Sequence, residues 1–596
     1  MSPALSPPSY ESTLSFPADP DALLFAASNS QLEPASLLAH AEQQFLASGD
    51  GRYLLAPALN CWQHKKDTEA HALLVRAAPT CSFNSTYYQL RGMVSRRLVG
   101  GPYFAEAKRC YELTIKLDPS RPDAYYNLGN LIHDDHFYEA ERAFILSLEL
   151  NAEAATVWHN LGRVFTDTDR HELSVKSLQC SLQLDPSVAD VWCNLGLAWH
   201  GYGHFDKAKR CLEFSIGLDR LHVPSHINMG NALLGLLQPD AAIQFLERGV
   251  ELEQSSSNSL WNLSLAYLLL GDYQRGWQYY EARFATKQFN FVTRPTIGTV
   301  PATLADCPSP TDPPLVVWTE QGIGDAIQFS RYLLLLKANS IPFVFFTRPS
   351  LLDLFSLWLG LGDLVFSDEN LHPNQDHRPN IALMSLPKLF GTTLATIPSV
   401  TPYLKAPASP PTNLIVTPPP GGISIGIVWA SNPSNKAMYR HKSFPIALLL
   451  PKLISLLEID LVEIHSLQVG SEANQLNPWL HHEKLFDWNH KLTNFSDTAY
   501  IVSQLDLVIS VDTAVAHMAG ALNIPTWLLL PYNSDFRWLR NTDRSPWYDS
   551  IRIFRQNQRG DWPDVINQVS EALNLLFLLD IDKLSKSAVN NVIHHG

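Results

Sequence analysis

The stretch between residues 506 and 531, DLVISVDTAVAHMAGALNIPTWLLLP, places an aspartate, a threonine and a histidine where a strand gives way to a helix. The run LVISV is apolar and rich in β-branched residues, which is typical of a strand buried on both faces. Asp512 and Thr513 end that run, and AVAHMAGAL continues at helical spacing. His517 lies one helical turn after Thr513, so we expect the three side chains at the same rim.

The same stretch predicts a phosphate-binding corner. TWLLL follows the helix as a second apolar run and completes a β-α-β unit, whose helix begins at the carboxyl edge of a parallel sheet. Backbone N–H groups at Thr513 and Ala514 then have no helical partners and lie at the positive end of the helix dipole. Such a corner suits a phosphate or diphosphate, although an ordinary β-α-β packing unit has the same pattern.

Composition excludes several classes of protein. The chain has 596 residues, enough for several domains, and a formal net charge of −14. No basic stripe is present, which argues against general nucleic-acid binding. The seven cysteines form no CxxC pair, so we expect buried thiols in a reducing compartment. His481, His482 and His490 have no regular ligand spacing, so no metal site is predicted.

The N-terminal segment, MSPALSPPSYESTLSFPADPD, is rich in proline and serine and lacks the basic and apolar regions of a secretory signal. No uninterrupted run of about 18 apolar residues occurs, so we predict no transmembrane helix. We therefore expect a cytoplasmic protein, with a disordered segment over residues 1–30 and a tail over 576–596.

A repeat of 33 to 34 residues runs through the first half. Its marker is a small residue preceded by Leu or Met, at Gly129, Gly162, Gly196, Gly230 and Ser264. This period resembles the tetratricopeptide repeat, in which two antiparallel helices interlock. With a divergent unit upstream, the array is expected over residues 85–286, after a helical capping segment at 31–84.

Stacked repeats of this kind form a concave groove. We expect this groove to bind a protein partner, with a rigid spacer or a dimerisation arm as the alternative. The repeat pattern does not identify the partner.

Alternating strand and helix patterns fill the second half, after a proline-rich linker at 287–313. Runs such as LVVWTEQ, IPFVFFT and ISIGIVWA indicate two Rossmann-like lobes, at 314–405 and 423–575, joined by a linker at 406–422. Gly322-Ile323-Gly324 matches the start of a dinucleotide fingerprint, but Ile327 stands where the third glycine belongs. The sequence therefore disfavours a nicotinamide oxidoreductase.

The second half resembles the ADP-heptose:lipopolysaccharide heptosyltransferase family, glycosyltransferase family 9. The matching stretches lie between residues 272 and 562 and include TEQGIGDAIQFSRYL, IGIVWASNP, HSLQVG and the segment around DTAVAH. The likeness is closer to bacterial proteins that fuse tetratricopeptide repeats to such a domain. It implies an α + α/β architecture, a repeat α-solenoid followed by a GT-B fold of two lobes. It also implies a metal-independent enzyme whose substrate is a nucleotide-sugar and which needs no cofactor.

The resemblance places the family's proposed general base at Asp325, just after the first strand of the first lobe. A carboxylate at a helix start in a cleft can accept a proton from an acceptor hydroxyl, although helix capping alone also favours Asp there. We expect Gln321, Gly322 and Gly324 on the acceptor side.

The second lobe is expected to hold the donor. The backbone at Thr513 and Ala514 would face the diphosphate, with Asp512 and His517 ordering the turn or touching the donor. Three cations, Lys436, Arg440 and Lys442, lie in the stretch SNPSNKAMYRHKS, before a helix expected to start near Ser443. A cation there would neutralise diphosphate charge, and a solvated basic loop is the alternative. We expect these four residues on the donor side as well.

Two further residues are candidates for the nucleoside pocket. Gln468 lies on the rim where the family binds the nucleoside, but the family's ribose-binding glutamate is missing at this point. Trp429 either lines the same pocket or packs in the core. We interpret Asp535, Arg537 and Trp538 as a structural loop.

The sequence thus favours a glycosyltransferase with a protein or glycan acceptor that the repeats help to recruit. The alternative, from another class, is a scaffold protein whose GT-B half has lost catalysis. Asp325 and the DTAVAH turn favour the enzyme, whereas the lysine spacing and the missing glutamate favour the scaffold.

Overall fold

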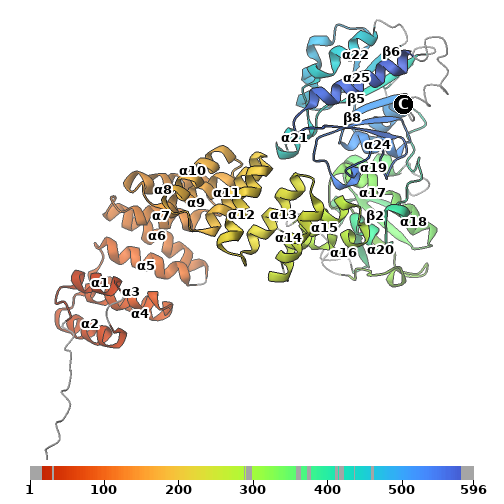
Figure 1. The fold of residues 1–596 in the computed structure, drawn as a ribbon. Helices are drawn as coiled ribbons and strands as arrows, with labels where there is room; N and C mark the ends of the chain where they lie inside the picture. Colours follow the sequence, from red (N-terminus) through yellow and green to blue (C-terminus); the bar gives the residue numbers. More distant parts are fainter. Residues whose placement is uncertain are drawn as a thin grey trace, which may run out of the picture. The chain divides into compact units, whose positions relative to one another are not determined.

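The fold comes from a computed structural model (Figure 1), which describes residues 16–578 except 30–32, 99, 255, 287–288, 290–297, 357–363, 372–376, 410–413, 415, 417–421, 435 and 458–461. The chain divides into two compact units, Met1–Asn228 and Met229–Gly596. The division falls within helix α13 (Val223–Gly235).

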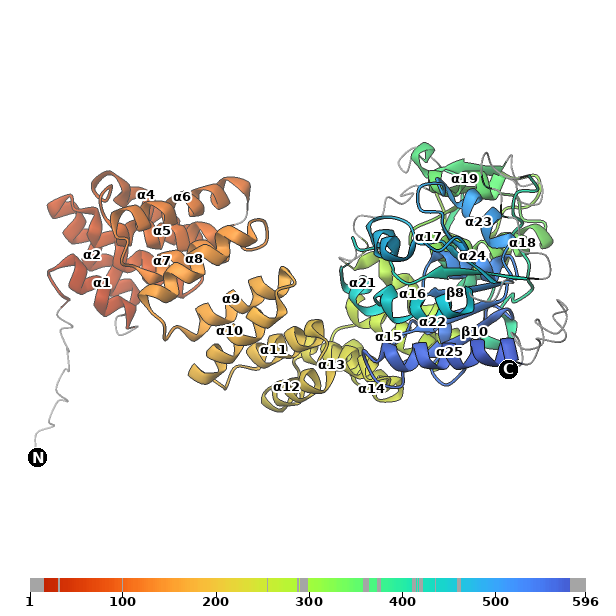
Figure 2. The same ribbon diagram turned by 90° about the horizontal axis from the view of Figure 1, so that it is seen from above.

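The first unit is helical, and its consecutive helices stack in antiparallel pairs (Figures 1 and 2). A capping segment holds α1 (Pro20–Ser28), α2 (Pro34–Ser48), α3 (Leu55–Gln63) and α4 (Asp67–Ala77). The repeat pairs are α5 (Ser85–Arg97) with α6 (Gly101–Leu117), α7 (Pro122–Ile132) with α8 (Phe137–Leu150), α9 (Ala155–Asp167) with α10 (His171–Leu184), and α11 (Ala189–Tyr202) with α12 (Phe205–Leu218).

Helix α1 corrects the expected disordered segment at 1–30. Asp19 caps the helix by accepting from the backbone N–H of Ala22 at 2.8 Å, and Pro20 occupies its first turn. Leu23 and Ala27 are buried against α2 and α3. The expectation failed over residues 20–28 because proline-rich composition concealed a helix-start signal, an Asp N-cap followed by Pro at N1.

The repeated glycines allow the two helices of each pair to approach closely. A Cβ built on Gly129 would lie 2.7 Å from the Phe144 ring, and one on Gly162 or Gly196 would lie 2.6 or 2.7 Å from Leu178 or Leu212. Each glycine thus accepts a large side chain from the second helix of its own repeat. The contact between a glycine and a large side chain therefore recurs with the 33–34-residue period that the sequence predicts.

Replacing Gly129 with alanine should destabilise the repeats by about 1–3 kcal/mol, because the new methyl group overlaps the Phe144 ring. The matched control is Gly217→Ala on α12, where a Cβ meets nothing within 4 Å. That control should be neutral or stabilising by up to about 1 kcal/mol, since alanine is the better helix former. Urea unfolding followed by circular dichroism measures both, and equal effects of the two substitutions would contradict the packing argument.

The second unit begins with repeat helices and continues as two α/β lobes. The helices are α14 (Pro239–Leu252), α15 (Ser257–Leu270) and α16 (Tyr273–Tyr280). The first lobe contains β1 (Leu315–Trp318), α17 (Ile323–Phe329), α18 (Arg331–Ala338), β2 (Phe343–Thr347), α19 (Pro349–Ser356), β3 (Val365–Ser367), β4 (Asn380–Ala382) and α20 (Leu386–Leu389). The second contains β5 (Ile423–Val428), α21 (Lys436–Lys442), α22 (Leu450–Leu457), β6 (Val462–Ser466), β7 (Leu485–Asp487), α23 (Phe495–Ser503), β8 (Leu507–Val511), α24 (Ala514–Ala521), β9 (Thr526–Leu530), β10 (Ile551–Arg555) and α25 (Trp562–Leu578).

Both sheets are parallel throughout their named strands. The first has the order β3-β2-β1-β4, and the second has the order β10-β9-β8-β5-β6-β7. Numbered within each lobe, these orders are 3-2-1-4 and 3-2-1-4-5-6, the doubly wound arrangement. The strand order reverses between β1 and β4 and between β5 and β8, and ligands bind at the carboxyl ends of such strands.

The second sheet is covered by helices on both faces (Figure 1). Its strands have few polar residues because alternate side chains enter different cores. Ile425 and Ile509 face α22 and α25, whereas Val508 faces α23 and α24. No helix in the described part of the chain is both long and apolar enough to span a bilayer.

Several element predictions are corrected in detail. The strand expected over 315–321 ends at Trp318, and the single helix expected after it is two helices, α17 and α18, which meet at Ser330. The polar stretch around Lys436 contains the short helix α21, and the helix expected from Ser443 begins only at Leu450 as α22. Most of the predicted linkers at 287–313 and 406–422 lies outside the described residues or has no long helix or strand.

The last repeat shares one apolar core with the lobes. Leu268, Tyr273 and Trp277 belong to the same buried cluster as Phe329 of the first lobe and Trp547 of the second. The Trp547 ring stacks on Tyr273 at 6.0 Å, and its Nε1 donates to the Tyr273 hydroxyl at 3.3 Å. The end of the array therefore forms part of the α/β half.

Candidate functional site

The candidate site lies where helices α17 and α24 pack against each other, between the two lobes (Figure 1). Each helix begins just after a strand beside which the sheet order reverses, β1 or β8. A Cβ built on Gly324 would lie 2.8 Å from Cδ2 of His517 and 3.6 Å from Cα of Ala514. The glycine predicted on the acceptor side therefore gives the two turns the room to meet.

Asp325 connects both lobes through its carboxylate. Oδ2 accepts from the backbone N–H of Gly322 at 2.9 Å, and Oδ1 accepts from Nη2 of Arg537 at 2.5 Å. Burial raises the pKa of the Asp325 carboxyl above its usual range, and the Arg537 guanidinium opposes that shift. The side chain keeps 22% of its surface exposed. The capping role is thus present, and the role as a base stays a prediction.

Asp512 forms a nearly buried ion pair with Lys442. The Lys442 Nζ donates to Oδ2 of Asp512 at 2.5 Å, and the two side chains are 14% and 7% exposed. Burial alone would lower the pKa of Lys442, but the charges of Asp512 and Asp535 and the hydrogen bond to Asp512 together raise it. The structure therefore places Lys442 at the corner, whereas Arg440 of the same stretch is exposed.

His517 is held as a neutral imidazole. Burial lowers its pKa to about 3. Its Nδ1 lies 3.0 Å from the Tyr548 hydroxyl, its Nε2 lies 3.7 Å from Oδ1 of Asp512, and its ring stacks on Trp538 at 5.3 Å. A neutral ring with Nε2–H toward the carboxylate satisfies both neighbours, with Nδ1 accepting from Tyr548. His517 thus packs beneath the Asp512–Ala514 corner as a neutral, buried side chain.

The corner itself is partly exposed to solvent. Thr513 and Ala514 are intermediate in exposure, whereas Asp512 and His517 are buried. Thr513 caps α24 without a side-chain hydrogen bond to the helix, and its Oγ1 lies 3.2 Å from the Ser510 hydroxyl. The first backbone N–H groups of an α-helix have no carbonyl partner within that helix. The predicted anion site at this corner depends on these N–H groups.

The remaining cations and Ser443 are placed differently. The side chain of Lys436 lies outside the described residues. Arg440 is exposed on α21. The Ser443 hydroxyl accepts from the backbone N–H of Ser431 at 2.9 Å, which ties the end of α21 to the turn after β5.

The two nucleoside-pocket candidates are internal. Trp429 is fully buried in the core between the sheet and α22, so it presents no surface to a ligand and the core alternative holds. Gln468 is 5% exposed, and its Oε1 accepts from the backbone N–H groups of Trp429 and Ala430 at 3.2 and 2.9 Å. The sequence could not show that this amide is used to fix the turn after β5.

On the acceptor side, Gln321 donates from Nε2 to the Tyr280 hydroxyl at 2.9 Å, while Gly322 is exposed. The preceding residue, Glu320, belongs to a buried charge cluster. Nη2 of Arg283 lies 3.0 Å from its Oε1 and 2.8 Å from the Ser385 hydroxyl. This cluster ties the segment after β1, which leads to Asp325, to the segment after the last repeat helix, α16.

Glu320 should make stability depend on pH. Burial raises its pKa from 4.5 to about 7, so between these values the folded chain binds more protons than the unfolded chain. Stability should therefore fall by roughly 3 kcal/mol as the pH rises through this window. Urea unfolding at pH 5 and pH 8 should show this loss, and Glu320→Gln should lack it. Glu369→Gln at an exposed position is the control, and parallel pH curves for the wild type and Glu320→Gln would refute the assignment.

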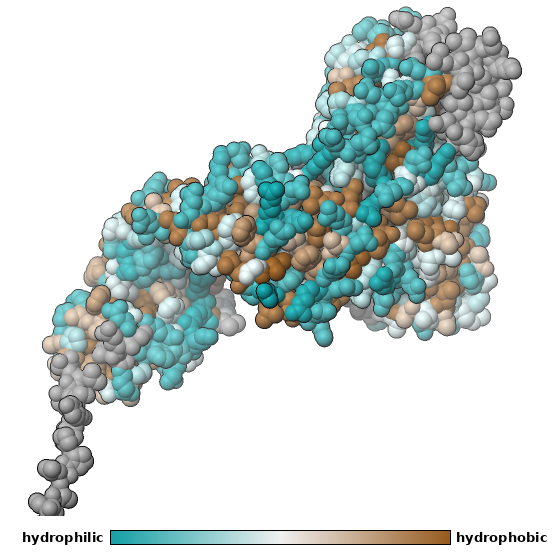
Figure 3. Space-filling view, in the orientation of Figure 1, coloured by the Kyte–Doolittle hydropathy of each residue, from teal (hydrophilic) through white to brown (hydrophobic). Residues whose placement is uncertain are grey.

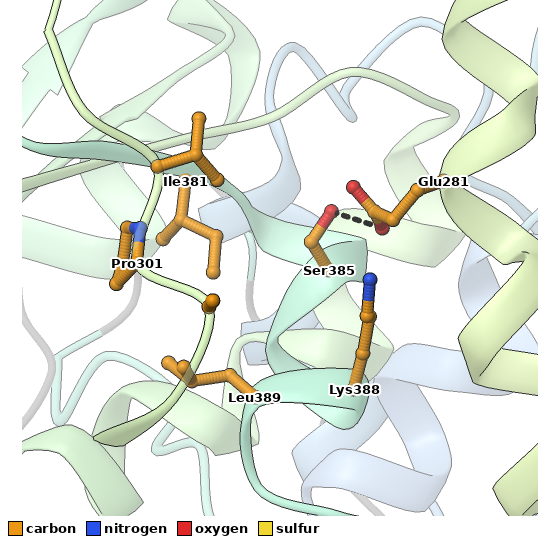
Figure 4. A pocket seen from close by; sticks show the side chains of 8 residues that line it. Glu281, Pro301, Ile381, Ser385, Lys388 and Leu389 are labelled. Atoms are coloured by element: carbon orange, nitrogen blue, oxygen red, sulfur yellow. Dashed lines mark hydrogen bonds between the residues drawn. The ribbon is translucent and has the colours of Figure 1, made fainter. Parts of the chain in front are cut away.

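A cavity of about 220 Å³ opens beside this cluster (Figure 4). Its polar residues are Glu281, Ser385 and Lys388, and the Ser385 hydroxyl donates to Oε1 of Glu281 at 2.7 Å. Apolar residues, Ile381 and Leu389 among them, form the rest of the lining. The cavity contains none of the predicted site residues.

Sequence reasoning missed the role of Arg537. Its guanidinium contacts Asp325, yet the sequence suggested only a structural loop. The two residues are 212 positions apart, so no local pattern could have paired them. In the part of the chain that the structure describes, no three His, Cys, Asp or Glu side chains cluster to hold a metal ion.

Comparisons with known proteins cover only part of the chain. No protein-family model matches the chain. Over 81 residues the sequence is 35% identical to protein FlbA of Caulobacter vibrioides, a stretch that covers 13% of this chain and 13% of FlbA.

Three solved structures match part of the chain. MamA is 24% identical with a TM-score of 0.26, covering 29% of this chain and 93% of MamA. YrrB, described as a TPR protein with an unusual peptide-binding site, is 16% identical with a TM-score of 0.26, covering 31% of this chain and 95% of YrrB. The Cut9–Hcn1 complex is 16% identical with a TM-score of 0.34, covering 45% of this chain and 52% of the matched chain.

The sequence period and the helix packing agree with the tetratricopeptide-type repeat predicted for the first part of the chain. The chain is a stacked helical solenoid followed by an α/β region with two parallel sheets, of four and six strands. This is the class of protein that the fold establishes.

Proposed function

We propose that the α/β half is a metal-independent glycosyltransferase with the GT-B arrangement, which moves a sugar from a nucleotide-diphosphate donor to a protein or glycan acceptor. One observation carries this proposal. The two lobes bring the Asp325 turn of one sheet against the Asp512–Ala514 corner of the other, each beside the reversal of its strand order. A ligand held there touches both lobes at the positions that favour ligand binding.

The residues present can supply the chemistry of an inverting transfer. The Asp325 carboxylate takes the proton of an acceptor hydroxyl as that oxygen bonds to the anomeric carbon of the sugar. The bond from this carbon to the diphosphate oxygen breaks, and the nucleoside diphosphate leaves with the electron pair. Backbone N–H groups at Thr513 and Ala514, together with Lys442, stabilise the charge that it carries away.

The repeats would recruit the acceptor or another protein. Their second helices expose large apolar side chains, including Tyr138 at 75%, Phe214 at 60% and Leu173 at 43%. Figure 3 shows such apolar surface among hydrophilic surface over the repeat helices. Exposed apolar groups of this kind suit contact with a protein.

A nucleotide screen tests the proposal. UDP-, GDP- and ADP-sugars are added to the full chain, and both the thermal shift and the release of nucleoside diphosphate are measured. One base should stabilise the protein, and Ala514→Glu should abolish the shift because its carboxylate would repel the diphosphate. Ala447→Glu, at an exposed position, is the control. No shift and no release with any nucleotide-sugar would refute the proposal.

A second candidate is a scaffold whose GT-B half has lost catalysis. The pairing of the charges favours it, since Asp325 is bound to Arg537 and Asp512 to Lys442. Under this alternative, nucleotides would bind without turnover or not bind at all. Asp325→Ala would then change neither result.

A further inference from the structure

Arg537 lies at the junction of the lobes and belongs to a short 3-10 turn, Phe536–Trp538, after β9. It is 6% exposed, although its side chain carries a permanent charge. A buried arginine needs partners for its guanidinium, and here the partners come from both lobes.

Each edge of the guanidinium has one side-chain partner. Nη2 donates to Oδ1 of Asp325 at 2.5 Å, Nε donates to Oε1 of Gln328 at 2.9 Å, and Nη1 donates to Oδ1 of Asp535 at 2.6 Å. Asp325 and Gln328 belong to α17 of the first lobe, whereas Asp535 precedes the same turn as Arg537. The guanidinium therefore cannot rotate without losing a charged contact.

The backbone that carries Arg537 is fixed by the apolar core. The Phe536 ring packs edge-on against Trp277 of the last repeat at 5.8 Å. The Trp538 ring stacks on His517 of the candidate site. Contacts with the last repeat and with His517 thus fix the position of the Arg537 guanidinium together.

We propose that Arg537 is a positioning residue for Asp325, which holds the carboxylate in place at the junction of the lobes and sets the range of pH over which it can accept a proton. This inference rests on the proposed function, because it assumes that Asp325 is the base. Oδ2 is held by the Gly322 N–H and Oδ1 by Arg537, so the plane of the carboxylate is fixed while each oxygen keeps a lone pair.

Other charges around Asp325 act in both directions. Two negative charges disfavour ionisation of the Asp325 carboxyl: Asp535, which lies beside Arg537, and Glu320, which follows β1. The positive charge of Lys442 on α21 favours that ionisation. Tyr280 of α16 and His517 of α24 are neutral neighbours. Arg537 is the cation in direct contact, so its removal leaves burial and the acidic neighbours less opposed. The pKa of Asp325 should then rise.

The experiment compares three variants of the full chain in the pH dependence of kcat/KM, using the nucleotide-sugar found by the screen. Arg537→Gln should move the acid limb to higher pH by about one unit and lower kcat/KM by about 10- to 100-fold. Arg537→Lys should restore much of the pH position but less of the rate, because the single nitrogen of an ammonium cannot reach the three partners that Nε, Nη1 and Nη2 of the guanidinium contact.

Arg331→Gln is the matched control. Arg331 is also a buried arginine that joins the lobes, with Nη1 donating to the carbonyl oxygens of Trp547 and Pro398 at 2.7 and 3.0 Å. It makes no contact with Asp325 among its side-chain bonds in the described structure. Arg331→Gln should lower stability and leave the acid limb where it is in the wild type.

The outcomes separate this inference from the proposed function. If the wild type turns over a nucleotide-sugar and the acid limb of Arg537→Gln stays in place, or moves equally in Arg331→Gln, the positioning role is overturned and the proposed function stands. If Arg537→Gln does not fold, Arg537→Lys decides by its rate: a lowered kcat/KM at an almost unchanged acid limb supports the positioning role, and a wild-type kcat/KM overturns it. A wild type that neither binds nor turns over any nucleotide-sugar refutes the proposed function first and, with it, this inference.

Discussion

Replacing Lys442 with methionine should weaken binding of the nucleoside diphosphate by about 100-fold and lower the free energy of unfolding by about 3 kcal/mol. Methionine fills a similar volume, so the change removes the charge with little loss of packing. It leaves the Asp512 carboxylate nearly buried without its partner at 2.5 Å. That carboxylate would then repel a diphosphate at the adjacent helix N-terminus, where Lys442 now offsets it.

Two controls define this result. Lys452→Met, at an exposed position on α22, should change neither binding nor stability. The double variant Lys442→Met with Asp512→Leu should recover most of the stability, because replacing both partners of a buried pair by apolar residues removes the unpaired charge. It should not recover binding, since the cation is still missing. Isothermal titration and urea unfolding measure the two effects, and a Lys442→Met protein with wild-type affinity would contradict a donor site at this corner.

The sequence predicted the corner well because its signals are local. A β-branched run, an Asp-Thr pair and a stretch of small residues are contiguous, and they fold as β8, the turn and α24. The contacts that surround the corner are not local. Lys442 lies 70 positions from Asp512, so the sequence showed three cations in one stretch but not which of them pairs.

The boundary of the repeats shows a similar limit. The repeat period continues to Gly276, and nothing in that period marks the change from the first unit to the second within α13. The aromatic residues Tyr273, Trp277 and Tyr280 are a signal in retrospect, since such rings are bulky for a last helix facing solvent. They are buried because all three belong to the apolar core shared with the first lobe. Tyr273 and Trp277 also contact Phe536 of the second lobe, and Tyr273 contacts Trp547.

The sequence also could not predict the directions in which the side chains of Trp429 and Gln468 point. Trp429 and Gln468 follow two neighbouring strands, β5 and β6, so a shared rim position was a reasonable inference. The fold turns the indole into the core, where it is fully buried, and uses the amide to bind the backbone of the β5 turn. Strand order fixes which turns meet, but the rotation of each residue within its turn depends on packing that only the structure shows.

The same geometry makes Asp325→Asn the most direct test of catalysis, with an expected loss of about 10²- to 10⁴-fold in turnover and little change in donor affinity. Asparagine has the shape of aspartate but cannot take a proton from an acceptor hydroxyl. It has one acceptor oxygen, which can serve either the Gly322 N–H or the Arg537 guanidinium, whereas the carboxylate serves both at 2.9 and 2.5 Å. The variant should therefore also lose about 1–3 kcal/mol of stability.

Two measurements distinguish a missing base from a damaged fold. Unlike Asp325→Asn, the variant Asp325→Glu keeps a carboxylate. Its side chain is longer by one methylene, so the carboxylate no longer meets the Gly322 N–H and the Arg537 guanidinium in the wild-type geometry. If Asp325 is the base, Asp325→Glu should recover part of the turnover without recovering the full stability, and both variants should keep the nucleotide-induced thermal shift. If Asp325 only caps α17, turnover should follow stability in both variants, and an Asp325→Asn protein with wild-type turnover would remove Asp325 from the reaction altogether.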